Sequence, residues 1–228
     1  MTRTLAEVGA EAADCTRCRL AQGRTQVVFG VGDPAADLVF IGEGPGFHED
    51  RQGEPFVGAA GHLLTRMLGE IGLTREQVYI CNVVLCRPPG NRDPRPDEID
   101  SCTPWLVEQL SLIQPLVVVT LGNFATRFVL TTQTGITRLR GKVHDWHGRK
   151  VIPTFHPAAI LHGGGERSRQ FELLREDFRL VGATLDELTR AAGESPESPE
   201  SPESPESPES PTGPVAVPDL EIDQMELF

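Results

Sequence analysis

Four of the five cysteines fall into two pairs that could hold a metal. Cys15 and Cys18 form a C-x-x-C motif, and Cys86 and Cys102 bracket a proline-rich loop. Four thiolates from two separated segments can close a tetrahedral zinc site or hold an iron–sulfur cluster, and spacing does not decide between them. The alternative is a lone redox C-x-x-C with two buried cysteines. Cys81 lies in an apolar stretch, where we expect it to pack as a small hydrophobic side chain.

A glycine-rich segment, GEGPGFHED, follows the apolar stretch LVFI. It resembles a phosphate-binding turn, but Pro45 removes a backbone amide that a phosphate would use. We therefore expect Gly42 and Gly44 to let the backbone approach a flat ligand closely. Glu43 and Glu49 lie on either side of this turn, where a pair of glutamates is commonly just solvated.

His156 directly follows another apolar stretch and precedes a proline, in FHPAA. At the end of a parallel strand, such a histidine can donate a directed hydrogen bond into a cleft. A structural role for His156 is the alternative that this position alone leaves open.

Short apolar runs rich in β-branched residues alternate four times with helical patterns. We expect strands at 38–42, 78–84, 116–121 and 151–155, and helices at 61–71, 95–111, 123–130 and 166–192. This alternation predicts an α/β protein with a parallel sheet covered on both faces. Ligands of such sheets bind beyond the carboxyl ends of the strands, so the loops that leave there are the candidate site.

The net charge of −12 is concentrated near the C-terminus. Residues 194–228 contain ten acidic and no basic residues, which leaves 23 acidic and 21 basic residues in the remainder. The near-neutral remainder does not exclude a nucleic-acid partner. Between 194 and 211 the triplet Glu-Ser-Pro occurs six times, a composition typical of extended, disordered chain. We expect one domain at 1–192 and a disordered spacer at 193–228.

The sequence contains no apolar run typical of a signal peptide or a membrane span. We therefore expect a cytoplasmic protein that binds no membrane. Disulfides are rare in that reducing compartment, so the cysteines point to metal binding, catalysis or burial.

Three motifs together resemble family 4 of the uracil-DNA glycosylases. They are GEGPGFHEDRQGEPFVGAAGHLL, NVVLCRPPGNRDP and HPAAIL, in this order, with cysteines at 15, 18, 86 and 102. The resemblance covers about 15–192. It implies a three-layer α/β/α fold with a central four-stranded parallel sheet, and a monomer that excises uracil from DNA in base excision repair. It also implies a [4Fe-4S] cluster on the four cysteines, which would attach the 86–102 loop to the domain.

The resemblance also implies roles for single residues. Phe56 would stack on the flipped base, and Asn82 would read uracil N3–H and O4 with its amide. Glu49 would exclude the thymine methyl group. His156 would stabilise the charge that develops on uracil O2, and Glu43 would stabilise the sugar cation and orient water.

Further pocket and DNA contacts are implied less directly. Gly42, Gly44 and Asn91 would complete the uracil pocket. The best-known uracil-DNA glycosylases carry an aspartate where this chain has Gly44, so the water-activating residue stays open. The candidate DNA contacts are Arg87, Arg92, Arg95, Arg140, Lys142 and Leu161.

Two other functions compete with uracil excision. A related superfamily type crosslinks to uracil-DNA through a histidine in an Arg-Arg-Ile-His insertion, but this chain has NRDPRPDE in that region. An inactive, cluster-bearing DNA-binding module is the second alternative, and the presence of Glu43, Asn82 and His156 together argues against it.

The last five residues suggest a separate partner. QMELF resembles the bacterial sliding-clamp-binding peptide, in which a glutamine and a terminal leucine–phenylalanine pair enter a clamp pocket. The corresponding residues are Gln224, Leu227 and Phe228. A polar spacer before them would tether the domain to replicating DNA and raise its local concentration there.

Overall fold

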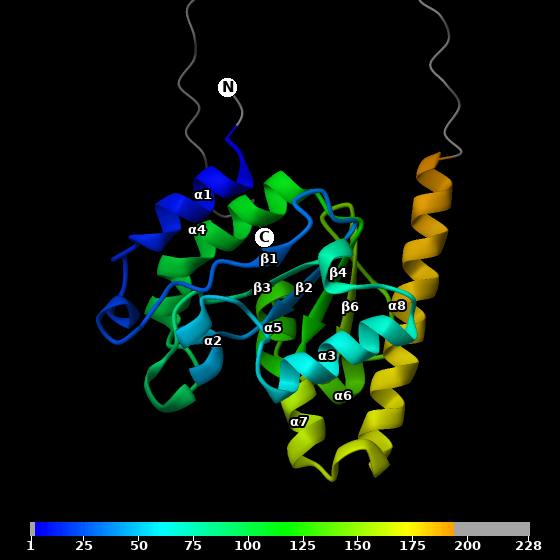
Figure 1. Cartoon of the computed structure of the whole chain (residues 1–228). Helices are drawn as coiled ribbons and strands as arrows, with labels where there is room; N and C mark the ends of the chain where they lie inside the picture. Colours follow the sequence, from blue (N-terminus) through cyan, green and yellow to red (C-terminus); the bar gives the residue numbers. More distant parts are fainter. Residues whose placement is uncertain (1–2, 194–228) are drawn as a thin grey trace, which may run out of the picture.

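Six strands form the central sheet of the computed structural model, which describes residues 3–193 (Figure 1). Their order across the sheet is β1-β3-β2-β4-β6-β5. The strands are β1 Val31–Gly32, β2 Leu38–Gly42, β3 Tyr79–Asn82, β4 Val117–Leu121, β5 His144–Trp146 and β6 Arg149–Thr154. The spacer predicted at 193–228 and the terminal QMELF peptide lie outside the described residues, except that residue 193 is the last residue of a helix.

The four inner strands β3, β2, β4 and β6 run parallel, which confirms the parallel sheet. The expected total of four strands is wrong, because β1 and β5 add antiparallel edges. β1 is two residues long, and β5 returns into β6 through a two-residue turn. His147 and Gly148 in this turn have φ of 46° and 76°, as tight hairpins require. Strands this short carry too few residues for a recognisable alternation.

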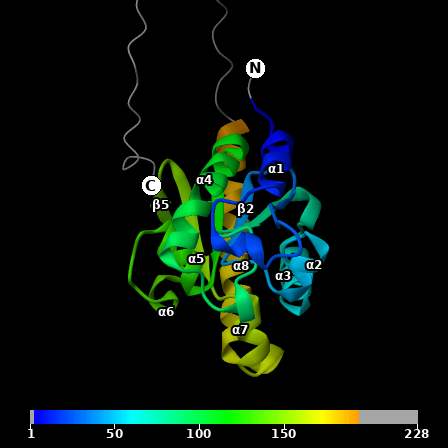
Figure 2. The same ribbon diagram turned by 90° about the vertical axis from the view of Figure 1, so that its left-hand side faces the viewer.

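Helices cover both faces of the sheet, which confirms the three layers. They are α1 Leu5–Ala13, α2 Phe47–Gln52, α3 Ala59–Glu70, α4 Pro96–Ile113, α5 Gly122–Val129, α6 Ile136–Leu139, α7 Pro157–His162 and α8 Arg169–Gly193. Figures 1 and 2 show α1 beside α4, on the opposite side of the sheet from α8. Among the described residues, none of the helices combines the length and apolarity needed to cross a membrane.

Each face of the sheet has its own hydrophobic core, because every residue of β2, β3 and β4 is buried. On the α3 and α8 face, Phe40 of β2 stacks on Phe178 of α8 with ring centroids 5.8 Å apart. On the α1 and α4 face, the core contains Trp105 and the buried Cys81 of β3. Cys81 therefore packs as a hydrophobic side chain.

The strand order places the candidate residues at one edge of the sheet. The chain leaves β2 toward β3 on one side and later returns to β4 on the other, so the order reverses between β2 and β4. Glu43 follows β2, Asn82 ends β3, Gly122 follows β4 and His156 comes two residues after β6. The carboxyl edge of a parallel sheet at such a reversal is where ligands bind.

A buried ion pair fixes the end of β6. Asp177 of α8 is fully buried and accepts hydrogen bonds from Arg140 at 2.6 and 2.9 Å and from the Thr154 hydroxyl at 2.5 Å. The Arg140 side chain is only 13% exposed. Arg140, a candidate DNA contact, thus holds the segment that leads to His156, and its guanidinium is already paired.

Candidate active site

A cavity of about 430 Å³ opens at the carboxyl edge of the parallel strands. This is the size range of small-molecule sites. The expected site residues on its wall are Glu43, Gly44, Glu49, Phe56, Asn82, Asn91, Arg92 and His156. The fold thus brings together loops that are more than 100 residues apart in sequence.

Asn82 carries the least satisfied polar group of the site. Its side chain is buried, and Oδ1 is the one buried side-chain nitrogen or oxygen among residues 3–193 that lacks a hydrogen-bond partner. Leaving such a group unpaired costs about 1–3 kcal/mol, which a ligand N–H can recover. A Cβ at Gly42 would collide with this Oδ1 and stand 2.7 Å from Phe56 Cζ. Only glycine at 42 therefore leaves room for the amide and the ring side by side.

Phe56 is held in a strained backbone conformation. Its φ is 55°, which is uncommon for a bulky residue, and its ring stacks on the His156 imidazole with centroids 5.6 Å apart. Arg75 holds this backbone by donating hydrogen bonds to the carbonyls of Phe56 at 3.2 Å and Pro55 at 2.8 Å. Gly61 lets α3 approach, since a Cβ there would collide with the Phe56 carbonyl. The role of Arg75 cannot be recognised from the sequence, because this arginine lies 19 residues from Phe56.

Glu49 positions the same segment from the other side. Its Oε1 accepts the backbone N–H groups of Val57 and Gly58, each at 3.0 Å. Gly58 is the N-cap of α3, where a negative charge is favoured by the free amides and the helix dipole. Glu49 therefore both lines the cavity and fixes the loop that carries Phe56.

His156 is a neutral hydrogen-bond donor in this environment. It caps α7, and its Nδ1 accepts the backbone N–H of Ala158 at 3.2 Å. The ring proton must then reside on Nε2, which is free to donate to a ligand. Burial lowers the pKa of His156 to about 4, and the nearby charge of Glu49 opposes this shift only in part.

Glu43 has the pKa of a general base. Burial raises the pKa of its carboxyl to about 7, and the negative charge of Asp93 adds to the shift. A second cavity of about 590 Å³ shares Glu43 and His156 with the first and reaches Asp93 and Gly122. Asp93 cannot be recognised as a site residue from the sequence, because only the fold brings it close to Glu43.

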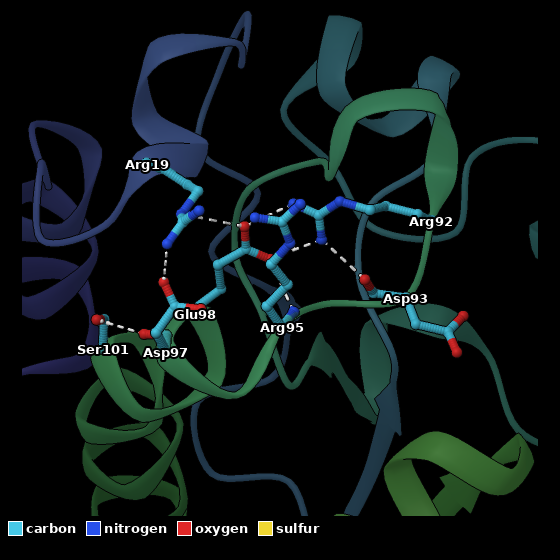
Figure 3. A network of polar contacts seen from close by, with 7 residues as sticks. All are labelled: Arg19, Arg92, Asp93, Arg95, Asp97, Glu98 and Ser101. Atoms are coloured by element: carbon cyan, nitrogen blue, oxygen red, sulfur yellow. Dashed lines mark hydrogen bonds and ion pairs between the residues drawn. The ribbon is translucent and has the colours of Figure 1, made fainter.

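The loop that carries Asn91 and Asp93 is fixed by a polar network at the start of α4 (Figure 3). Arg92 donates two hydrogen bonds to the buried Glu98, at 2.6 and 2.8 Å, and these lower the pKa of Glu98 to about 2. The backbone N–H of Arg95 also donates to Glu98, at 2.8 Å. The guanidinium of Arg92, a candidate DNA contact, is therefore already committed to Glu98.

The same network reaches the first cysteine pair. Arg19, next to Cys18, forms an ion pair with Asp97 at 2.6 Å and lies 3.9 Å from Glu98 (Figure 3). The N-terminal segment and the 86–102 loop are thus joined by ion pairs.

The four paired cysteines line one small cavity, together with Arg24 and Trp105. Three of their sulfurs accept N–H hydrogen bonds. Trp105 Nε1 donates to Cys15 at 3.3 Å, Arg24 to Cys86 at 3.5 Å, and the Leu85 backbone to Cys102 at 3.3 Å. Such N–H groups stabilise the negative charge of thiolate ligands, so the donor set suits a metal centre.

Burial disfavours the thiolate form of two of these four cysteines. Burial raises the pKa of Cys102 to about 12 and raises that of Cys86 as well. Within residues 3–193, no group of three or more His, Cys, Asp or Glu side chains is arranged to hold a single metal ion. Because the pKa values of Cys86 and Cys102 are raised, metal binding by these two thiols would require the loss of their protons.

The remaining candidate DNA contacts differ in position. Leu161 is 40% exposed on α7, whose Ala158 and His162 line the first cavity. Arg87 donates to Asn91 Oδ1 at 2.7 Å, at the rim of that cavity. Lys142 and Arg95 are exposed, and neither lines either of the two cavities that share Glu43.

These features define an α/β protein with one cavity at the carboxyl edge of its parallel strands and another cavity lined by four cysteines. A model of the uracil DNA glycosylase superfamily matches residues 29–179. A type-4 uracil-DNA glycosylase of Thermotoga maritima is 50% identical over 163 residues, which cover 71% of this chain and 82% of the relative.

Two archaeal proteins with the same name are similarly close. That of Archaeoglobus fulgidus is 46% identical over 187 residues, 78% of this chain and 92% of the relative. That of Sulfurisphaera tokodaii is 45% identical over 187 residues, 78% of this chain and 83% of the relative. The chain belongs to the uracil-DNA glycosylase superfamily, which confirms the resemblance seen in the sequence.

The environment of His156 predicts its titration. We expect the imidazole to titrate near pH 4 rather than near the ordinary value of about 6.5. Between these values the unfolded chain binds the proton and the folded chain does not, so His156 lowers the stability as the pH falls through this window. Nitrogen-15 NMR would give the midpoint and the Nε2–H tautomer. A midpoint at the ordinary value, or an Nδ1–H tautomer, would contradict this account.

Proposed function

We propose that the protein flips uracil out of DNA and hydrolyses its N-glycosidic bond, which leaves an abasic site for base excision repair. The observation that carries this proposal is the unpaired, buried Oδ1 of Asn82 in a cavity bounded by Phe56 and His156. Family membership and the named activity of the close relatives support the same reaction.

Recognition would use the amide of Asn82. Uracil N3–H donates to Oδ1, and the amide N–H donates to uracil O4, while the base stacks on Phe56. Cytosine presents an acceptor at N3 and a donor at N4, so it would leave the buried amide unpaired at a cost of about 1–3 kcal/mol. Glu49 is proposed to fill the space beside C5, which excludes thymine. Gly44 and Asn91 complete the pocket wall, while Gly42 does not line the cavity and contributes by leaving room for the Asn82 amide and the Phe56 ring.

Bond cleavage would use His156 and Glu43. The electron pair of the glycosidic bond goes to uracil N1, and the charge on O2 is stabilised by the His156 Nε2–H. The sugar becomes an oxocarbenium-like cation, which the ionised Glu43 stabilises. Water then adds to C1′ and gives its proton to Glu43. A neutral histidine suits this task because it stabilises the charge on uracil O2 without protonating uracil before the glycosidic bond breaks.

We further propose that Cys15, Cys18, Cys86 and Cys102 hold a [4Fe-4S] cluster. The support is the shared cavity and the N–H groups that point at three of the sulfurs. When bound, the cluster supplies a structural link and takes no part in bond cleavage. Iron and acid-labile sulfide in the purified protein would support it, and stoichiometric zinc would contradict it.

The DNA-facing surface is proposed to include Leu161 and Arg87. Leu161 would enter the base stack as the uracil leaves it. Arg95 and Lys142 remain candidate DNA contacts only because they are exposed. Arg92 and Arg140 are left out, because their guanidinium groups pair with Glu98 and Asp177.

Replacing Asn82 tests the function. Incubation with a uracil oligonucleotide followed by hot alkali should give a cleaved strand, and Asn82→Ala should lower kcat/KM by about 10- to 100-fold. Since Oδ1 has no protein partner, the variant loses no hydrogen bond there, and its thermal unfolding serves as the folding control. A protein–DNA adduct would mean the crosslinking alternative, and the absence of both products would reject the proposed enzyme activity.

The pH dependence tests Glu43. Because the ionised carboxylate is required, kcat/KM should rise with pH through a midpoint near 7. Asp93→Asn should move this midpoint to lower pH, because it removes the neighbouring negative charge. Glu43→Gln should leave a low activity without that midpoint. An unchanged acid limb in Glu43→Gln would reject Glu43 as the base.

We also propose that QMELF binds the replicative sliding clamp, which the apolar residues after a polar, proline-punctuated stretch support. Deletion of 224–228 should abolish capture by the clamp in a pull-down, whereas shortening the Glu-Ser-Pro run from six repeats to three should not. Equal capture of the deletion variant would reject the peptide. We also propose that the protein is a monomer and that it is located in the cytoplasm. Light scattering would test the oligomeric state, and cell fractionation would test the location.

A further inference from the structure

Phe47 is the most exposed of the large apolar side chains within residues 3–193. It is 46% exposed, and only Val143 and Leu161, each at 40%, join it in the exposed class. Two of these three lie on helices that border the first cavity. Phe47 begins α2, whose Glu49 lines the cavity, and Leu161 belongs to α7. Two exposed apolar side chains thus belong to helices that contribute other residues to the cavity lining.

Two guanidinium groups hold the Phe47 ring in place. The Cζ atom of Arg51 is 5.6 Å from the ring centroid, and that of Arg87 is 5.2 Å from it. Both distances fall within the range of cation–π attraction. Arg51 lies one turn along α2, whereas Arg87 belongs to the loop after Cys86. The ring is therefore fixed at the junction of α2 and this loop while almost half of its surface stays open.

Arg87 connects this ring to the uracil cavity. Its Nε donates to Asn91 Oδ1 at 2.7 Å, and Asn91 lines the cavity. Asn91, Arg87, Phe47 and Arg51 thus form a continuous row from the cavity to the surface. We call Phe47, Arg51 and Arg87 the Phe47 platform.

The charges of the platform are available to a ligand. Neither Arg51 nor Arg87 forms an ion pair with a carboxylate in the described part of the chain. Arg92 and Arg140 differ, because acidic side chains already hold their guanidinium groups. A partly exposed aromatic ring close to two such cations is a combination that can bind a base together with its phosphate.

We propose that the Phe47 platform binds the nucleotide next to the flipped uracil in single-stranded DNA. The base of that nucleotide stacks on the open part of the Phe47 ring, and its phosphates lie against Arg51 and Arg87. A base in a single strand is free to leave its neighbours for the ring, whereas a base in a duplex is held by pairing and stacking. The proposal rests on uracil excision as the function, and it assigns single-stranded DNA as the substrate class that this surface favours.

Binding to an uncleavable substrate tests the platform in the full chain. The probe is a fluorescent oligonucleotide with one 2′-fluoroarabino-uridine, used as a single strand and as a duplex, with affinity read by anisotropy. Phe47→Ala should raise the Kd for the single strand by about 5- to 20-fold and change that for the duplex by less than about 2-fold. Phe47→Trp should keep the affinity, and Phe47→Leu should lose it as Phe47→Ala does.

Two further variants sharpen the result. Val143→Ala removes an apolar side chain of similar exposure that lines neither cavity, and it should change neither affinity. Arg51→Ala should reduce the slope of log Kd against log salt by about one phosphate contact on the single strand. An unchanged slope would show that Arg51 makes no phosphate contact and does not belong to the Phe47 platform.

The outcomes separate this inference from the proposed function. A wild-type protein that releases no uracil from either substrate would end the proposed function, whatever Phe47 does. A wild-type protein that releases uracil, together with a Phe47→Ala variant that binds the single strand as tightly, would overturn the platform. Equal losses on single strand and duplex, or full rescue by Phe47→Leu, would also overturn it, because neither is expected of base stacking in unpaired DNA.

Discussion

The hydrogen bonds and ion pairs of the buried Glu98 carboxylate are the interactions on which the first cavity and the cysteine-lined cavity both depend. It accepts two hydrogen bonds from Arg92 and one from the Arg95 backbone, and Arg19 approaches it from beside the first cysteine pair. The loop fixed in this way delivers Asn91 to the first cavity and Asp93 to Glu43. Burying an ionised carboxylate is unfavourable unless it is fully paired, and here the pairing is complete. The loop geometry is therefore set before any ligand is bound.

Burial acts in opposite directions on the two proposed catalytic groups. It disfavours the charged form of each, so it raises the pKa of Glu43 to about 7 and lowers that of His156 to about 4. Both groups can then act at neutral pH, Glu43 as a base of moderate strength and His156 as a neutral donor. Asp93 adds to the effect on Glu43, while the α7 cap selects the tautomer of His156.

The part of the site that is proposed to bind uracil contains two features that are unfavourable for the stability of the folded protein. The Asn82 oxygen is buried without a partner, and Phe56 has a positive φ. Arg75 and Glu49 hold this loop through backbone hydrogen bonds, so it cannot relax. The expected consequence is a pocket whose shape and hydrogen-bonding groups are ready for a planar base, at some cost to the stability of the free protein.

The sequence by itself determined the four parallel strands, because runs such as LVFI and VVVTL are apolar throughout and are buried on both faces. Its motifs also named eight of the residues that line the cavity, because these motifs resemble those of the family in the same order. Only the tertiary structure decided which cations are free. Arg51, Arg87, Arg92 and Arg140 look alike in sequence, yet two of them pair with buried carboxylates and two flank Phe47. The physical reason is that an ion pair depends on which residues the fold brings together, as with Arg140 and Asp177, which are 37 positions apart.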